Sequence, residues 1–466
     1  MRPMQSVRYL WLVILLFATF ASAADEEQIV MSKEALWAAA GETYGADPDK
    51  SVALQQYQLF LNRYGGTKHA ARAQFMIAEC YFENGDFETA MREYAKVEKR
   101  KGKTDYLKAS ALLRKGECQY NLERLPEALE TFTFLADKYG DTFLNAEALF
   151  AAGQVQAAME NWRGVAKTYK RLLEDRPGYS DLPRVKFALG LYAYVEGDYD
   201  VAADYFKDIK SDLGLYYLGR CLEASGQYIL AVQRYRQSLR LYPDSHLSDD
   251  VAFSVGEAFY NSDQNKIALR SYRDFLEEYP DSRFTPLARY KEACVHYRME
   301  NYQECIRKLE GLCGDMTGEP ICAPSHYLTG SAYMELGRNS HAIFAYTEVV
   351  RGYPESELAS AAMHKIVYAY THELNHPQAI LMAREFLDLF PGDELAARVQ
   401  VLKGFSHMEL AEYDLAVREF QNVLDRHVNS EVVERVLFLA TTTYTELEQF
   451  YRLITNYHFI ANPLFP

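Results

Sequence analysis

A repeat of about 37 residues constrains this chain more than any other feature. A small residue, which we name the anchor, recurs along the sequence at Gly41, Ala78, Gly116, Gly153, Gly190, Gly219, Gly256, Ala293, Gly330, Val367, Gly404 and Thr441. The steps are 37 residues, apart from one of 38 and one of 29, and eight of the twelve anchors are Gly although the chain holds only 25. A period of this size indicates a solenoid, in which each unit buries its apolar face against its neighbours.

Each unit is predicted to form two helices joined by a short turn. In the unit 248–282, the first helix carries Gly256 and the second carries Ala268 and Tyr272. The two small residues let the backbones approach, and Tyr272, one turn beyond Ala268, fills the space beside that contact. Pro280 ends the second helix because it lacks a backbone donor. Ten of the twelve units carry an aromatic residue sixteen after the anchor: Tyr57, Tyr94, Phe132, Tyr169, Phe206, Tyr235, Tyr272, Tyr346, Phe420 and Tyr457.

This pattern resembles the tetratricopeptide repeat (TPR) family over roughly residues 32–466. Trp37 stands at the family's Trp position, and Gly85-Asp86 and Gly197-Asp198 match its turn. The resemblance implies an all-α, right-handed superhelical α-solenoid of about twelve helix-turn-helix repeats, which acts as a scaffold for protein or peptide partners. The 37-residue step departs from the usual repeat of about 34 residues.

The turn between units has a variant form. Tyr-Pro-Asp/Glu-Ser occurs at 242–245, 279–282 and 353–356. It is similar to bacterial envelope members of the family, namely the lipoprotein component of the outer-membrane β-barrel assembly machinery and the periplasmic coordinator of the Tol–Pal system. The resemblance therefore implies a role in outer-membrane assembly, cell-wall coordination or secretion.

Residues 1–23 are predicted to be a signal peptide. Arg2 and Arg8 precede or begin an apolar stretch that runs from Tyr9 to Phe20, and Ala21-Ser22-Ala23 follows. The stretch is too short to span a bilayer, and the small-x-small motif is typical of a cleavage site near Ala23. We expect a periplasmic mature chain, 24–466, without a transmembrane segment; a retained amino-terminal anchor is the alternative. No Cys lies near the cleavage site, so the sequence does not support a lipid anchor. Association with the outer membrane is therefore implied by the resemblance alone.

The charge of the chain limits its partners. It holds 50 basic and 65 acidic residues, for a net charge of −15. An acidic surface argues against nucleic acid or anionic lipid as the main partner, although acidity for solubility alone is an alternative reading. The sequence has no P-loop, no G-x-S-x-G motif and no dinucleotide fingerprint, so we expect no cofactor and no catalysis.

One motif matches the signature of another class of protein, the zinc proteases, and offers an alternative to the scaffold. Residues 372–376 read His-Glu-Leu-Asn-His, which matches the H-E-x-x-H signature of zinc proteases, with His372 and His376 as ligands and Glu373 as base. The repeat register instead places His372 at the end of one helix, Leu374 in the turn and Pro377 at the start of the next helix. The two His side chains would then lie on either side of a turn, and an exported metalloprotease is the less favoured reading. A purely structural array with no dedicated groove is a further alternative to the scaffold.

The seven Cys fall into two groups. Cys80, Cys118 and Cys221 stand two residues after an anchor and are expected in the core. Cys294, Cys305, Cys313 and Cys322 lie in one unit, where Cys313 and Cys322 flank a Gly-rich loop. In an oxidising compartment these two are predicted to form a disulfide, and metal binding is less favoured because no paired close spacing occurs.

The resemblance also assigns a binding face. In the family, first-helix residues one and four after the anchor line the concave surface. Here those positions give the carboxylates Glu42, Glu79, Glu117 and Glu257 and the aromatics Phe82, Tyr120, Tyr194, Tyr260 and Tyr297. Such a face suits a peptide with basic and apolar side chains, while for the carboxylates a purely solvated face is the alternative. The aromatics three before the anchor, such as Phe75 and Phe253, belong either to this groove or to the core.

The last unit has no later helix to cover it. Thr441 is followed by Leu453 and Tyr457 at the expected offsets, and the sequence after Arg452 holds no Asp, Glu, Lys or Arg. An uncovered solenoid end leaves apolar surface in water. We therefore expect residues 431–466 to contact a second subunit or a partner, or to continue into a longer protein. Folding back of Phe459, Leu464 and Phe465 as a cap is the alternative.

Overall fold

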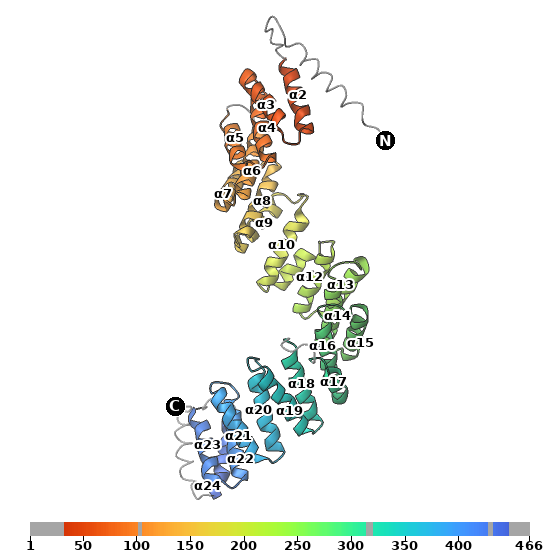
Figure 1. Cartoon of the computed structure of the whole chain (residues 1–466), viewed down its shortest axis with the longest axis vertical. Coiled ribbons are helices and arrows are strands. Elements are labelled where there is room, and N and C mark those ends of the chain that lie inside the picture. The colour runs from red at the N-terminus through yellow and green to blue at the C-terminus, as the bar shows by residue number, and fades with distance from the viewer. Residues whose placement is uncertain (1–31, 101–104, 314–319, 427–431, 447–466) are drawn as a thin grey trace, which may run out of the picture. The chain divides into compact units, whose positions relative to one another are not determined.

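The computed structural model describes residues 32–100, 105–313, 320–426 and 432–446. All regular secondary structure in these ranges is helical, in the twenty-three helices α2 to α24 (Figure 1). The predicted all-α fold is confirmed. The signal peptide predicted at 1–23 and the terminal stretch 447–466 lie outside the described residues.

The chain divides into two compact units, one ending at Tyr192 and the other beginning at Ala193. The first unit holds α2 (Lys33–Ala46), α3 (Ser51–Tyr64), α4 (Ala70–Glu83), α5 (Phe87–Lys99), α6 (Asp105–Asn121), α7 (Leu125–Lys138), α8 (Leu144–Ala158) and α9 (Trp162–Asp175). The division falls within α10 (Leu182–Val195). From α2 to α9 each helix packs against the next one along the chain.

The second unit repeats this arrangement. It holds α11 (Tyr199–Phe206), α12 (Asp212–Ala224), α13 (Tyr228–Leu241), α14 (Ser248–Asn261), α15 (Asn265–Glu278), α16 (Thr285–Arg298), α17 (Tyr302–Leu309), α18 (Cys322–Glu335), α19 (Asn339–Gly352), α20 (Ala359–His372), α21 (His376–Leu389), α22 (Ala396–Glu409), α23 (Tyr413–Arg426) and α24 (Val433–Glu446). Each of these helices also packs on its successor. Consecutive packing of helix pairs is the defining feature of an α-solenoid.

The anchor glycines touch the aromatic rings that the sequence paired with them. A Cβ added to Gly256 would lie 2.6 Å from Cε1 of Tyr272, which is fully buried. An added Cβ would also fall closer than 3.0 Å to the ring sixteen residues on at Gly116, Gly153, Gly219, Gly330 and Gly404. The predicted contact between the anchor Gly and the ring sixteen residues later is therefore confirmed in these six repeats. Gly41 differs, because nothing lies within 4 Å of its added Cβ.

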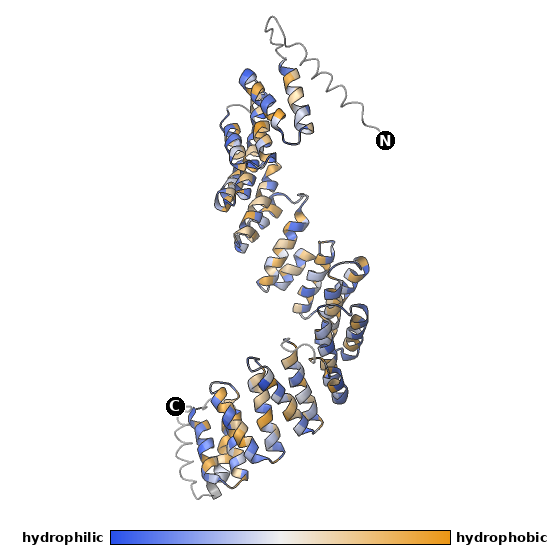
Figure 2. Ribbon diagram, in the orientation of Figure 1, coloured by the Kyte–Doolittle hydropathy of each residue, from blue (hydrophilic) through white to orange (hydrophobic). Residues whose placement is uncertain are grey.

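The aromatics three before the anchor pack on the core, and Phe253 is buried in it. Phe253 is only 7% exposed, and its ring centroid lies 6.0 Å from that of Tyr272. The same pairing, at 5.3 to 6.3 Å, joins Phe75 to Tyr94, Phe150 to Tyr169, Tyr216 to Tyr235 and Tyr327 to Tyr346. The ring on each second helix thus contacts both a Gly and a second ring on the first helix. Apolar and polar residues accordingly alternate around the helices (Figure 2).

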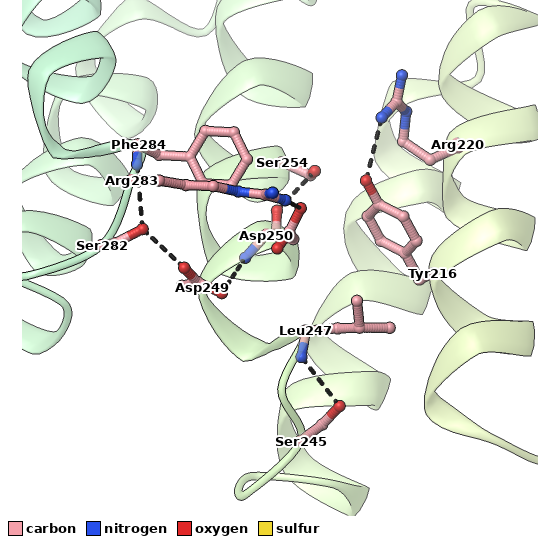
Figure 3. A network of polar contacts seen from close by, with 10 residues as sticks. All are labelled: Tyr216, Arg220, Ser245, Leu247, Asp249, Asp250, Ser254, Ser282, Arg283 and Phe284. Carbon is pink, nitrogen blue, oxygen red and sulfur yellow. Dashed lines mark hydrogen bonds and ion pairs between the residues drawn. The ribbon is translucent and has the colours of Figure 1, made fainter.

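The Tyr-Pro-Asp-Ser turns bind one repeat to the previous one. Ser282 Oγ accepts a hydrogen bond from the Phe284 backbone N–H at 3.2 Å and donates to Asp249 at 2.7 Å (Figure 3). Arg283 adds an ion pair to Asp250 at 2.7 Å. Ser245 closes its own turn in the same way and donates to Asp212. This Ser therefore fixes the turn and also holds the start of the preceding first helix.

Two second helices are shorter than the rest. α11 and α17 have 8 residues, whereas the other second helices have 13 or 14. The shortening of α11 agrees with the 29-residue step that separates the anchors Gly190 and Gly219. After α17 the 37-residue step is kept, and the chain instead turns at Gly311, whose φ is 75°.

Candidate partner-binding face

The predicted face of the first unit is a cluster around one arginine. Glu79, on α4, is 7% exposed and accepts a hydrogen bond from the Tyr94 hydroxyl. Arg114, from the next first helix α6, pairs with Glu79 at 3.3 Å and with Glu117 at 2.8 Å. Its guanidinium also lies 5.0 Å from the ring centroid of Phe82. Burial raises the pKa of Glu79, so this carboxylate depends on its partners inside the chain.

The second unit repeats this cluster around Glu257. This carboxylate, on α14, accepts from the Tyr272 hydroxyl and pairs with Lys291 of α16 at 2.7 Å. The guanidinium of Arg298 lies 3.6 Å from the ring centroid of Tyr260, and the Lys291 ammonium lies 5.1 Å from it. Arg298 also donates to the Tyr260 carbonyl at 2.8 Å. A charge pair and a cation stacked on an aromatic ring therefore link two consecutive repeats, as in the first unit.

The repeat anchored at Gly219 carries a cation where the other two repeats carry a Glu, but its buried tyrosine still donates a hydrogen bond to a carboxylate. Arg220 takes the place of the Glu and donates to the Tyr216 hydroxyl at 3.1 Å (Figure 3). Tyr235 donates instead to Glu223 at 2.9 Å, which stands four after the anchor. Tyr194 packs edge-on against Tyr199, with ring centroids 5.4 Å apart.

The remaining predicted residues stand outside these clusters. Glu42 is exposed on α2, and Tyr120 is 42% exposed on α6. Tyr297 packs edge-on against Tyr302 at 5.3 Å. None of these three residues contacts the Arg114 or Arg298 guanidinium in the hydrogen bonds and ion pairs of the described residues.

Sequence reasoning missed the cations that join the repeats. Arg114 and Lys291 both stand two residues before an anchor, and Arg298 stands five after one. This recurrence of a basic residue two before the anchor was a signal that a charged partner reaches back to the previous unit. As a result, Glu79, Glu117 and Glu257 are paired with cations of the chain rather than free.

The His-Glu-Leu-Asn-His motif is split by a turn, as the repeat register predicted. α20 ends at His372, α21 begins at His376, and Leu374 between them has φ 58°. His372 lies 2.8 Å from the Tyr368 hydroxyl, while His376 is 7% exposed. The zinc-protease arrangement requires both His on one helical face, and this chain does not provide it. Across the part of the chain that the structure describes, no three His, Cys, Asp or Glu side chains gather as metal ligands would.

The cysteines separate as their positions suggested. Cys80, Cys118 and Cys221 are fully buried, and burial raises the pKa of each thiol to about 12. They are core residues with inert thiols. The structure joins Cys313 to Cys322 in a disulfide whose Cα atoms are 5.5 Å apart.

The fold and this face define a helical-repeat protein of the kind that serves as an interaction scaffold. Two tetratricopeptide-repeat models match the sequence, one over residues 39–105 and 143–214 and the other over 214–245 and 250–282. A third model, described as an outer membrane lipoprotein, matches residues 323–457. The chain belongs to the tetratricopeptide repeat family and resembles its envelope members.

Solved structures with a similar arrangement share little sequence with this chain. A tetratricopeptide repeat protein from Parabacteroides merdae is 16% identical, with a TM-score of 0.40, and the match covers 55% of this chain and 98% of that one. Yeast Tom70 is 12% identical, with a TM-score of 0.37, and the match covers 89% and 96%. A search of curated proteins gave no match. Among the described helices, none combines the length and apolar character needed to cross a bilayer.

Proposed function

We propose that this chain is a non-enzymatic scaffold of the bacterial cell envelope that binds protein or peptide partners through the face of its first helices. The observation that carries the proposal is the recurring cluster in which a Glu, a Tyr and a cation connect neighbouring repeats. Glu79 with Arg114 and Glu257 with Lys291 hold a cation against the rings of Phe82 and Tyr260 in two of the repeats. Fixed rings and paired charges suit an extended or helical peptide that carries basic and apolar side chains.

The envelope setting rests on sequence features. Residues 1–23 have the composition of a signal peptide, and the outer membrane lipoprotein model matches 323–457. We infer export to the periplasm, with association at the outer membrane, and work in outer-membrane assembly, cell-wall coordination or secretion. The acidic net charge of −15 is consistent with a protein partner rather than nucleic acid.

We also infer that the carboxy-terminal repeat contacts a second copy of the chain or a partner. Phe438, on α24, is 71% exposed. A contact with a second copy or a partner would remove this apolar surface from water. Catalysis is not part of the proposal, because the one protease-like motif is divided between two helices.

A site-specific photo-crosslinker tests the proposed face. We would place p-benzoylphenylalanine at Tyr260, within the second-unit cluster, and in a matched variant at Arg270, an exposed residue of the second helix α15. Irradiation of the native envelope should give discrete adducts from the Tyr260 variant and few from the Arg270 variant. Equal adducts from both positions, or none from either, would contradict the proposed binding face. Cell fractionation of the same strains tests the periplasmic location.

A further inference from the structure

A hollow lies beside α18 because α17 stops early. In the preceding repeat, Arg273 of α15 reaches the next first helix, where it pairs with Glu292 at 2.9 Å and lies 3.5 Å from His296. Arg273 stands seventeen residues after its anchor. Seventeen residues after the anchor Ala293 stands Glu310, which lies beyond the end of α17. The short helix therefore cannot cover α18 in the way that α15 covers α16.

The uncovered region is a groove along α18 and α19. A hollow of about 670 Å³ is lined by the end of α17 and by both of these helices. A second hollow, of about 470 Å³, shares His326, Thr329 and Tyr333 with the first. A pair of rings in contact lies at each end of this combined hollow. The ring centroids of His326 and Tyr353 are 6.1 Å apart, and those of Tyr333 and His341 are 5.1 Å apart. We name this feature, from Tyr353 to His341, the α18–α19 groove.

The other short helix produces the same feature. Beside α11, a hollow of about 410 Å³ is lined by α12 and α13. Its residues Leu215, Leu218, Leu241 and Tyr242 stand at the same distances from the anchor Gly219 as His326, Thr329, Gly352 and Tyr353 stand from Gly330. Shortening of a second helix thus opens the following repeat at a fixed place, so the groove is a consequence of the repeat design.

The two hollows differ in charge. The α18–α19 groove is lined by Glu310 and Glu348, and its described lining holds neither Lys nor Arg. Burial lowers the pKa of His326, so this ring is neutral near pH 7 and adds no positive charge. The hollow beside α11 has the opposite character, because Lys207, Lys210 and Arg234 line it and its described lining holds no carboxylate.

We propose that the α18–α19 groove binds a segment of a partner protein that carries a Lys or Arg side chain next to an apolar one. Glu310 and Glu348 attract the cation, and the rings of Tyr333 and Tyr353 give it aromatic surfaces. Phe344, 69% exposed and on the groove wall, offers contact to the apolar neighbour. A volume of about 670 Å³ holds side chains rather than a whole helix. This inference rests on the proposed function, in which the partners are proteins or peptides.

Fluorescence anisotropy of the full chain tests the proposal with two labelled peptides, GSLRFSG and a matched GSLEFSG. The Arg peptide should bind and the Glu peptide should not. Glu348→Gln should weaken binding about threefold, which is typical of an exposed charge pair, and Glu348→Arg should weaken it about tenfold through like-charge repulsion. The matched control is Gln237→Arg, eighteen residues after its anchor as Glu348 is after its own, but in the hollow beside α11. It should leave binding of the Arg peptide unchanged.

Three results with the peptides and Glu348→Arg alone would overturn the inference. They are equal binding of the two peptides, unchanged binding by Glu348→Arg, and no binding of either peptide to a chain whose circular dichroism shows it folded. An equal loss in Gln237→Arg and Glu348→Arg would also contradict it, because a general change in net charge would then explain both. If crosslinking through Tyr260 persists while these tests fail, the proposed function stands and the groove assignment is wrong.

Discussion

Replacing Gly256 by Ala tests the contact on which the repeat depends. The new Cβ would lie 2.6 Å from Cε1 and 2.7 Å from Cδ1 of Tyr272, and real Cβ atoms do not approach other atoms so closely. The ring cannot turn away, because Tyr272 is fully buried, packs on Phe253 and donates its hydroxyl to Glu257. The two helices must therefore separate.

The size of the effect follows from two opposing terms. Overpacking a well-filled core costs about 1–3 kcal/mol, and Gly→Ala within a helix returns about 1 kcal/mol. The net loss is thus about 0–2 kcal/mol, centred on about 1 kcal/mol. Gly41→Ala is the matched control, since nothing lies within 4 Å of its added Cβ. That change should stabilise α2 by up to about 1 kcal/mol. Ala78, which faces Tyr94 at the same register, shows that helices can accommodate the methyl group when they are set for it.

Hydrogen exchange read by mass spectrometry suits this test, because solenoids unfold locally and a single global transition is not assured. Peptides from α14 and α15 should exchange faster in Gly256→Ala, and peptides from α2 should exchange more slowly in Gly41→Ala. A second change, Tyr272→Leu, should restore part of the loss, because it removes the ring that the methyl group meets. Equal protection of α14 in the wild type and Gly256→Ala, or no rescue by Tyr272→Leu, would refute the packing argument.

Further changes test the remaining features. Glu79→Lys should destabilise the first unit by about 3 kcal/mol, since it places a cation beside Arg114 in a buried site, whereas exposed Glu42→Lys should change stability by less than about 0.5 kcal/mol; equal urea midpoints would contradict this. Burial lowers the pKa of His364 to about 4, so stability is complete above pH ~6.5 and falls by about 2 kcal/mol at pH 5, a loss that His364→Gln should remove. Cys313→Ser should reduce stability near α18 by about 2–3 kcal/mol under oxidising conditions and by nothing in reductant. Purified protein should hold no stoichiometric zinc, and a proteolytic activity lost in Glu373→Gln would show this expectation to be wrong.

Much of the fold follows from the sequence because the repeat constrains each position many times over. Gly256 and Tyr272 suggested their contact from spacing alone, and five further units repeat it. The turn within the zinc-like motif was predictable for the same reason, since Leu374 stands where other units carry Gly with positive φ. From a single repeat, residues 372–376 could equally be a zinc-binding helix or a turn between two helices. The register of the other repeats favoured the turn.

The role of the candidate face was harder to predict, because spacing locates a residue but does not show what reaches it. The sequence placed Glu79 and Glu257 on the first helices, where free carboxylates and internal partners look alike. The structure shows that Arg114 and Lys291 extend from the following repeat to pair with them. Backbone periodicity does not determine which carboxylate a long Lys or Arg side chain of the neighbouring repeat will reach. Only the recurrence of a basic residue two before the anchor could have indicated these ion pairs.

The two short helices show how an array with uniform repeats can become specific along its length. A regular unit covers the next first helix with residues such as Arg273, so its surface positions are already occupied. Removing the end of a second helix exposes the same register positions in the following repeat, and their side chains are then free to diverge. The hollow after α11 is lined by cations, among them Lys207, and the hollow after α17 is lined by carboxylates, among them Glu310, which stands at the same distance from its anchor as Lys207 does. Because the backbone is repeated and only the helix length changes, selection for a binding groove requires the loss of about two turns rather than a new fold.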